Sequence, residues 1–163
     1  MATLRSRILL AYGLTLVLAL LWLAAIVLAP VLRKAGSGTA AVLYACFAPA
    51  CHQDPARSFS LLGAPLAVCS RCLGIYSGFL AGLGLYPFAR GFDSVRLPGW
   101  RAFIPVSLPL VLDGLANALR LWDSPNLLRF LFGFAWGTIL PFYVLTALGE
   151  LALSKLAIPT AKK

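Results

Sequence analysis

Long apolar runs separated by short polar connections dominate the chain, and four of these runs have the length of a membrane span. They cover residues 8–32, 70–88, 103–122 and 127–156. An α-helix rises about 1.5 Å per residue and the hydrocarbon core of a bilayer is about 30 Å thick, so runs of this length can cross a membrane. The pattern therefore predicts an all-α, integral membrane four-helix bundle, formed by a single domain over residues 1–163.

A shorter apolar segment, residues 40–50, follows a polar break at residues 36–39. This segment is too short to cross a bilayer, which predicts a short interfacial or re-entrant helix that leans on the bundle. A Cys/His loop at residues 46–72 then connects the first two spans. The first apolar run is longer than the ~7–15 residues of a signal-peptide core, so we expect it to be a retained helix.

Composition supports the membrane assignment and explains the charge. Hydrophobic residues make up 61% of the 163 residues, charged residues make up 12%, and the mean hydropathy is +0.89, values far from those of soluble globular domains. The net charge of +9 comes from 14 Lys and Arg that are scattered in ones and twos, mostly between the apolar runs. Because these residues form no basic patch with interleaved aromatics, we expect the partner to be the lipid bilayer and not nucleic acid.

The distribution of the positive residues predicts an orientation in the cell (inner) membrane. With four spans, eight Lys and Arg flank the side that holds both termini: Arg5, Arg7, Arg90, Arg96, Arg101, Lys155, Lys162 and Lys163. Six flank the other side: Arg33, Lys34, Arg57, Arg71, Arg120 and Arg129. The positive-inside rule then predicts a multi-pass protein with cytoplasmic N- and C-termini and with the Cys/His loop facing outward.

Two runs carry glycines at four-residue intervals, which lie on one helix face. Gly74, Gly78 and Gly82 form one such stripe, and Gly133 and Gly137 form a second pair. Small residues at this spacing let the backbones of membrane helices approach closely. We expect a tight packing seam here, either within the bundle or against membrane protein partners.

All four cysteines and the single histidine lie in the Cys/His loop or at its ends. Cys69 and Cys72 have the C-x2-C spacing that places two sulfurs on the same side of a turn, and Cys51 and His52 supply two further soft ligands. These four residues predict a Cys3His site for zinc or a similar thiophilic transition metal. Cys46 is an alternative ligand in place of His52.

Other chemistries fit the same residues. Cys69 and Cys72 begin a helix, where the helix dipole and Arg71 favour the thiolate, so Cys46/Cys51 and Cys69/Cys72 could exchange disulfides as in quinone-linked membrane oxidoreductases. The Cys46-x4-Cys51-His52 stretch also resembles a lengthened haem-attachment motif, although this leaves Cys69 and Cys72 unexplained. Structural disulfides, or buried cysteines acting as small apolar residues, are the remaining alternatives.

Several polar residues are expected near the same membrane face as the cysteines, where they would surround the Cys/His site. Arg57, Asp113, Asn126 and Arg129 are expected to surround the metal or to bind an anionic small ligand or lipid headgroup. The alternatives are a buried ion pair of Asp113 with Arg129 or Arg120, and arginines that reach toward headgroups. The sequence alone does not decide whether the protein is an enzyme or an accessory subunit of a membrane complex.

The loop and the segments after it resemble a family of small multi-pass prokaryotic membrane proteins with a domain of unknown function. The motif reads Cys51-His52-Gln53, then Arg57-Ser58-Phe59, then Cys69-x-Arg71-Cys72-x-Gly74-Ile75-Tyr76-x-Gly78. The downstream block contains Asp113-Gly114, Ser124-x-Asn126, Arg129 and Gly133. The resemblance covers roughly residues 40–140 and implies the fold and the membrane location, but no activity. It centres on Cys51, His52, Cys69 and Cys72 without Cys46, which favours one Cys3His site over two dithiol pairs.

Overall fold

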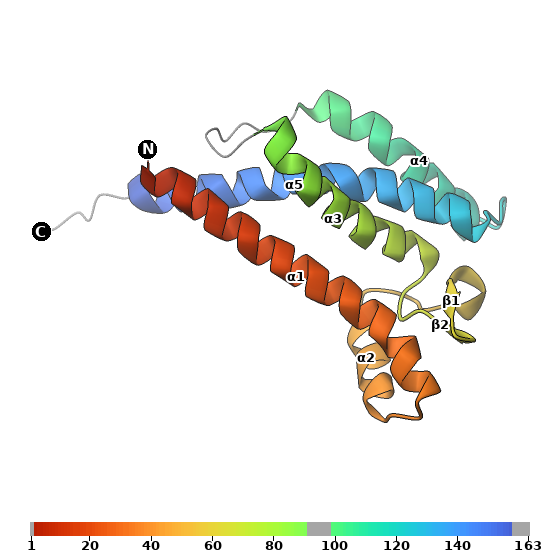
Figure 1. The fold of residues 1–163 in the computed structure, drawn as a ribbon. Coiled ribbons are helices and arrows are strands. Elements are labelled where there is room, and N and C mark those ends of the chain that lie inside the picture. The colour runs from red at the N-terminus through yellow and green to blue at the C-terminus, as the bar shows by residue number, and fades with distance from the viewer. Residues whose placement is uncertain (1, 91–98, 158–163) are drawn as a thin grey trace, which may run out of the picture.

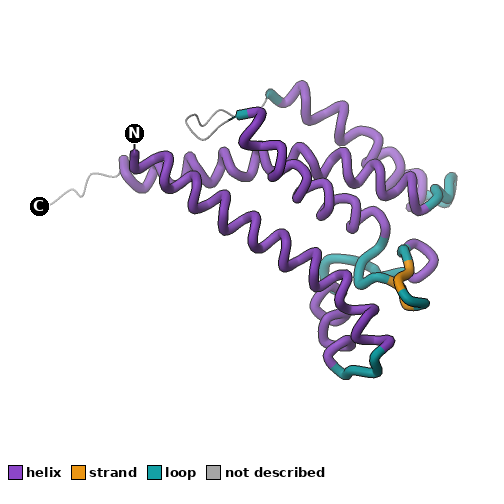
Figure 2. Tube along the Cα trace, in the orientation of Figure 1, coloured by secondary structure: helices purple, strands orange, loops and turns teal. Residues whose placement is uncertain are grey.

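Five α-helices make up most of the computed structural model, which describes residues 2–90 and 99–157 (Figure 1). The helices are α1 (Ala2–Lys34), α2 (Thr39–Phe47), α3 (Ser70–Ala89), α4 (Trp100–Ala118) and α5 (Asn126–Ala157). A 3-10 helix η1 (Pro55–Arg57) and an antiparallel pair of short strands, β1 (Ser60–Leu61) and β2 (Ala64–Pro65), interrupt the loop before α3 (Figure 2). The predicted helical membrane fold is confirmed. Arg96, Lys162 and Lys163 of the charge count lie outside the described residues.

The sequence predicts four membrane spans, and this number is not exact. Three of the described helices are long and apolar enough to cross a membrane, over Ile8–Lys34, Ser70–Ala89 and Asn126–Gly149. The helix α4 is long enough, at 19 residues, but polar groups such as Arg101, Asp113 and Asn117 lower its hydropathy. It nevertheless runs beside α5 in Figure 1, with Asp113 and Asn117 buried and most of its leucines and valines exposed.

The glycine stripes pack α3 directly onto α5. Added methyl groups at Gly74, Gly78 and Gly82 of α3 would collide with the backbone of α5, and those at Gly133 and Gly137 would collide with the backbone of α3. The predicted close packing is therefore confirmed, and it lies within the chain. All five glycines are buried in this seam, so the contact that they make in the structure is between α3 and α5.

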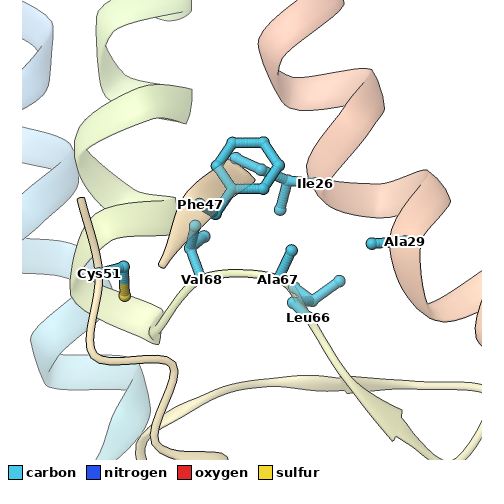
Figure 3. Packing of buried hydrophobic residues seen from close by; sticks show 7 residues of the cluster. All are labelled: Ile26, Ala29, Phe47, Cys51, Leu66, Ala67 and Val68. Atoms are coloured by element: carbon cyan, nitrogen blue, oxygen red, sulfur yellow. The ribbon is translucent and has the colours of Figure 1, made fainter. Parts of the chain in front are cut away.

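The helix α1 diverges from the α3/α5 pair toward one end of the molecule, where α2 folds back against it (Figure 1). An apolar cluster around Ile26, Phe47, Cys51 and Val68 fills the space between α1, the end of α2 and the segment before α3 (Figure 3). This cluster joins α1 and α2 to the segment that leads into α3. The Cys/His loop therefore lies at one end of the bundle, while α1 begins and α5 ends at the opposite end (Figure 1).

Candidate metal centre

Three cysteine sulfurs converge at the N-terminal end of α3. Cys51 lies in the loop after α2, Cys69 precedes the first residue of α3 in an extended conformation, and Cys72 lies in the first turn. Their Sγ atoms all lie within 4.8 Å of one another. All three thiols are free, and the backbone N–H of Cys69 donates a hydrogen bond to Cys51 Sγ at 3.1 Å. We call this group the cysteine cluster.

Gln53 fixes the loop that carries Cys51. Its Nε2 donates hydrogen bonds of 2.7 Å to the carbonyl oxygens of Tyr44 in α2 and Ala67 before α3. Its backbone has a φ of 51°, a left-handed conformation that costs about 1–2 kcal/mol for a residue other than glycine. The two hydrogen bonds hold this turn, and the turn brings Cys51 to α3. The resemblance motif includes Gln53, but residue types alone gave it no role.

Hydrogen bonding within the cysteine cluster favours a thiolate at Cys51. Bonds from the Cys69 and Cys72 thiols lower the pKa of Cys51, and the backbone N–H groups of Cys69 and Gln53 add to this effect. Burial opposes the shift and does not outweigh it. A cysteine in this state is a metal ligand or a nucleophile at neutral pH.

The two other candidate ligands lie apart from the cysteine cluster. His52 is exposed, and its ring is not part of the three-sulfur group. Its neighbour Cys51 is buried, as expected where consecutive residues of an irregular loop point in different directions. Cys46 is exposed in α2 and is also outside the group. Three of the four predicted metal ligands are therefore brought together.

A cavity of about 430 Å³ lies beside the cysteine cluster. Cys51, Cys69 and Cys72 form part of its lining, and His52 also lines it. Its other charged lining residues are Asp54, Arg57, Arg71 and Arg129. The predicted neighbours Arg57 and Arg129 thus share a cavity with the sulfurs, and the structure adds Arg71 to them.

Asp113 forms a buried ion pair with Arg71, and not with the expected Arg129 or Arg120. The side chain of Asp113 is only 3% exposed. Asn117, one turn further along α4, donates to Asp113 Oδ1 at 3.1 Å and to Ser124 Oγ at 3.0 Å. Because Arg71 lies between Cys69 and Cys72 in sequence, this pair ties α4 to the helix turn that carries two of the sulfurs.

Arg129 and Asn126, both at the start of α5, extend the hydrogen-bonded network that includes Asp113 and Asn117. Arg129 is buried, and its guanidinium donates to Asn117 Oδ1 at 2.7 Å, Asp123 Oδ1 at 2.6 Å and Ser124 Oγ at 3.1 Å. Asn126 Oδ1 accepts from Ser70 Oγ at 3.2 Å, and its Nδ2 donates to the carbonyl oxygen of Ala56 at 3.2 Å. These bonds connect α5 with α3, α4 and the Cys/His loop.

The protein is thus a helical membrane protein that carries three convergent cysteines at one end of its helix bundle. The chain belongs to the family described as "Predicted membrane protein (DUF2085)", whose profile matches residues 51–143. The resemblance seen in the sequence is thereby confirmed.

Two archaeal proteins are similar to this chain. One is "Uncharacterized protein MJ1492" of Methanocaldococcus jannaschii, which is 40% identical over 113 residues, covering 69% of this chain and 72% of the relative. The other is an "Uncharacterized protein" of Methanothermobacter thermautotrophicus, which is 36% identical over 87 residues, covering 53% of this chain and 77% of the relative. No solved structure matches the chain.

Proposed function

We propose that this membrane protein binds zinc or a similar thiophilic metal ion through Cys51, Cys69 and Cys72. The observation that supports the proposal is the approach of three free thiols to within 4.8 Å of one another. Three sulfurs at this separation can share one ion at the usual Zn–S distance of about 2.3 Å with small side-chain adjustments. The lowered pKa of Cys51 and the position of Cys69 at a helix N-terminus favour the deprotonated ligands that a metal requires.

We propose His52 as the fourth ligand. Its side chain already lines the cavity that borders the sulfurs, and ligation requires its exposed ring to turn toward them. A tetrahedral Cys3His shell without an open position is typical of structural zinc sites. The ion would then pin the loop after α2 to the first turn of α3, and Asp113, Asn126 and Arg129 would hold that turn against α4 and α5.

A structural metal site at a bundle end suits an accessory subunit of a larger membrane complex. We propose that the protein lies in the cell membrane with both termini in the cytoplasm and the metal at the outer face. The arrangement of α1 and α5 supports this, since α1 begins and α5 ends at the same end of the molecule (Figure 1). The excess of Lys and Arg on the side of the termini, eight against six, points the same way.

Elemental analysis of the detergent-purified protein tests the metal proposal. We expect about one metal ion per chain in the wild-type protein, and its loss in Cys69→Ser and Cys72→Ser. Cys46→Ser is the matched control and should retain the metal, because Cys46 lies outside the cysteine cluster. His52→Ala reports separately on the fourth ligand. Wild-type protein without metal after purification under reducing conditions would contradict the proposal.

Thiol–disulfide exchange linked to a quinone is the second candidate function, and the lowered pKa of Cys51 is the observation that favours it. It requires Cys46/Cys51 and Cys69/Cys72 to act as pairs, whereas Cys46 is exposed and apart from the cluster. A count of free thiols under denaturing, non-reducing conditions separates the two functions. Four free thiols together with bound metal support the metal site, and two disulfides without metal support the redox function.

A further inference from the structure

The cavity beside the cysteine cluster carries more positive than negative charge on its walls. Three guanidinium groups line it, from Arg57, Arg71 and Arg129, against the single carboxylate of Asp54. Asp113 and Asp123, which pair with Arg71 and Arg129, are not among its described lining residues. Those carboxylates hold the guanidinium groups in place without occupying the cavity.

Arg71 has a buried donor with no partner. Its Nε atom is inaccessible and makes no hydrogen bond within the described residues, while its terminal nitrogen pairs with Asp113. A buried donor of a charged group that lacks an acceptor is costly and rare. An acceptor in the adjoining cavity would supply the missing hydrogen bond once the Arg71 side chain turns its Nε toward the cavity.

We propose that this cavity binds a phosphate group through Arg71, Arg129 and Arg57. A phosphate presents several oxygens in different directions, so it can accept from more than one guanidinium, and arginine forks match its geometry. Arg129 is buried and held by its network, which makes it a preorganised donor. Arg57 is half exposed and forms an ion pair with Asp54 at 3.4 Å, which leaves its remaining guanidinium donors for a ligand. This site lies beside the proposed metal ion and does not depend on it.

The phosphate can belong to a lipid headgroup or to a small soluble molecule. The cavity lies at the end of the bundle where α3 begins, the level at which membrane headgroups are found. Arginine side chains bind phosphate groups through paired hydrogen bonds, and a volume of about 430 Å³ is large enough for one phosphate group. The binding experiment therefore requires one arm for each source.

Full-length protein in a neutral maltoside detergent serves for both arms. Equilibrium dialysis with radiolabelled inorganic phosphate measures binding of the free anion. Native mass spectrometry with short-chain phosphatidylglycerol measures binding of the headgroup, with the matching diacylglycerol as a control for the tails. Metal content is measured on every sample, so that failure of the metal proposal is seen separately from failure of this one.

Three variants locate the binding. Arg71→Lys keeps a positive charge opposite Asp113 but lacks the Nε donor, and Arg57→Gln removes a half-exposed cation whose ion pair is with the exposed Asp54. We expect each to weaken phosphate-group binding by about tenfold or more. Arg120→Gln is the matched control, because Arg120 is exposed and does not line the cavity. This control should bind as the wild-type protein does.

Binding of inorganic phosphate supports the site, and binding of phosphatidylglycerol alone supports it with a lipid as the source. If the wild-type protein binds a probe but contains no metal, the binding supports this inference and the missing metal contradicts the metal proposal. A folded wild-type protein that binds neither probe overturns the inference. Equal binding by Arg71→Lys, Arg57→Gln and Arg120→Gln also overturns it, because the phosphate would then lie elsewhere.

Discussion

The carboxylate of Asp113 in α4 pairs with the guanidinium of Arg71, the residue that lies between Cys69 and Cys72 at the start of α3. The pair places a buried negative charge directly behind the helix turn that presents two of the three sulfurs. It therefore links the position of α4 to the geometry of the cysteine cluster.

Neutralising Asp113 should destabilise the protein. Asp113→Asn keeps the size of the side chain but leaves Arg71 without its counter-charge, and we expect a loss of about 1–3 kcal/mol in the free energy of unfolding. An exposed pair provides the control, since the side chains of Arg57 and Asp54 are 49% and 44% exposed and Asp54→Asn should cost less than about 1 kcal/mol. Thermal unfolding in detergent measures both, and equal effects would show that burial of the Asp113 pair is unimportant.

The glycine seam gives a sharper test of the fold. A methyl group at Gly78 would meet the backbone of Phe134, so Gly78→Ala should force α3 and α5 apart and cost about 1–3 kcal/mol. Gly84→Ala, on the same helix, has open space around the added methyl group and should be neutral or slightly stabilising. The same unfolding assay compares the two, and a Gly78→Ala protein as stable as Gly84→Ala would refute the seam.

The sequence predicted the glycine seam but not the charge partner of Asp113. Glycines four apart in an apolar run have few other uses, so the packing seam followed from spacing alone. Which helix faces met could not be read from one chain, because the residues that contact each other lie more than fifty positions apart. The partner of Asp113 was missed for the same reason, since sequence neighbours such as Arg120 and Arg129 looked equally suitable.

The candidate metal centre was also predicted only in part from the sequence. The C-x2-C spacing predicted that Cys69 and Cys72 lie together, and the structure brings Cys51 to them. His52 follows Cys51 in sequence, but adjacency in an irregular loop does not fix the direction of a side chain, and the ring is exposed. The role of Gln53 depends on a left-handed turn and on two carbonyl groups from distant segments, which residue types do not reveal. The span count failed at α4, where buried polar groups lower the hydropathy.

Gln53 should control metal affinity without contacting the metal. Gln53→Ala removes both hydrogen bonds that hold the loop while it retains the strained backbone, so Cys51 should be held less firmly against α3. We expect an affinity about tenfold lower, because positioning of ligands by neighbouring groups typically contributes a factor of 10–100. Competition with a chromophoric chelator measures this affinity. An unchanged value would show that the loop holds Cys51 by apolar packing alone.

Removing the metal should expose Cys51 to thiol reagents. Cys51 is only 5% exposed and would be ligated in the metal-bound protein, so a maleimide should modify Cys46 first. After chelation, we expect modification of Cys51, Cys69 and Cys72 as the loop separates from α3. Mass spectrometry of proteolytic peptides gives the site of each modification. Identical labelling with and without chelator would indicate that no metal protects the cluster.

X-ray absorption spectroscopy of the purified, metal-loaded protein identifies the atoms that surround the metal. A metal held by Cys51, Cys69 and Cys72 should show a shell of three sulfur atoms at about 2.3 Å for zinc, with one lighter atom at about 2.0–2.1 Å. The Cys69→Ser variant should lose this shell, and Cys46→Ser should keep it. A metal surrounded only by nitrogen and oxygen atoms, or a sulfur shell that survives in Cys69→Ser, would contradict the assignment of the cysteine cluster as a metal site.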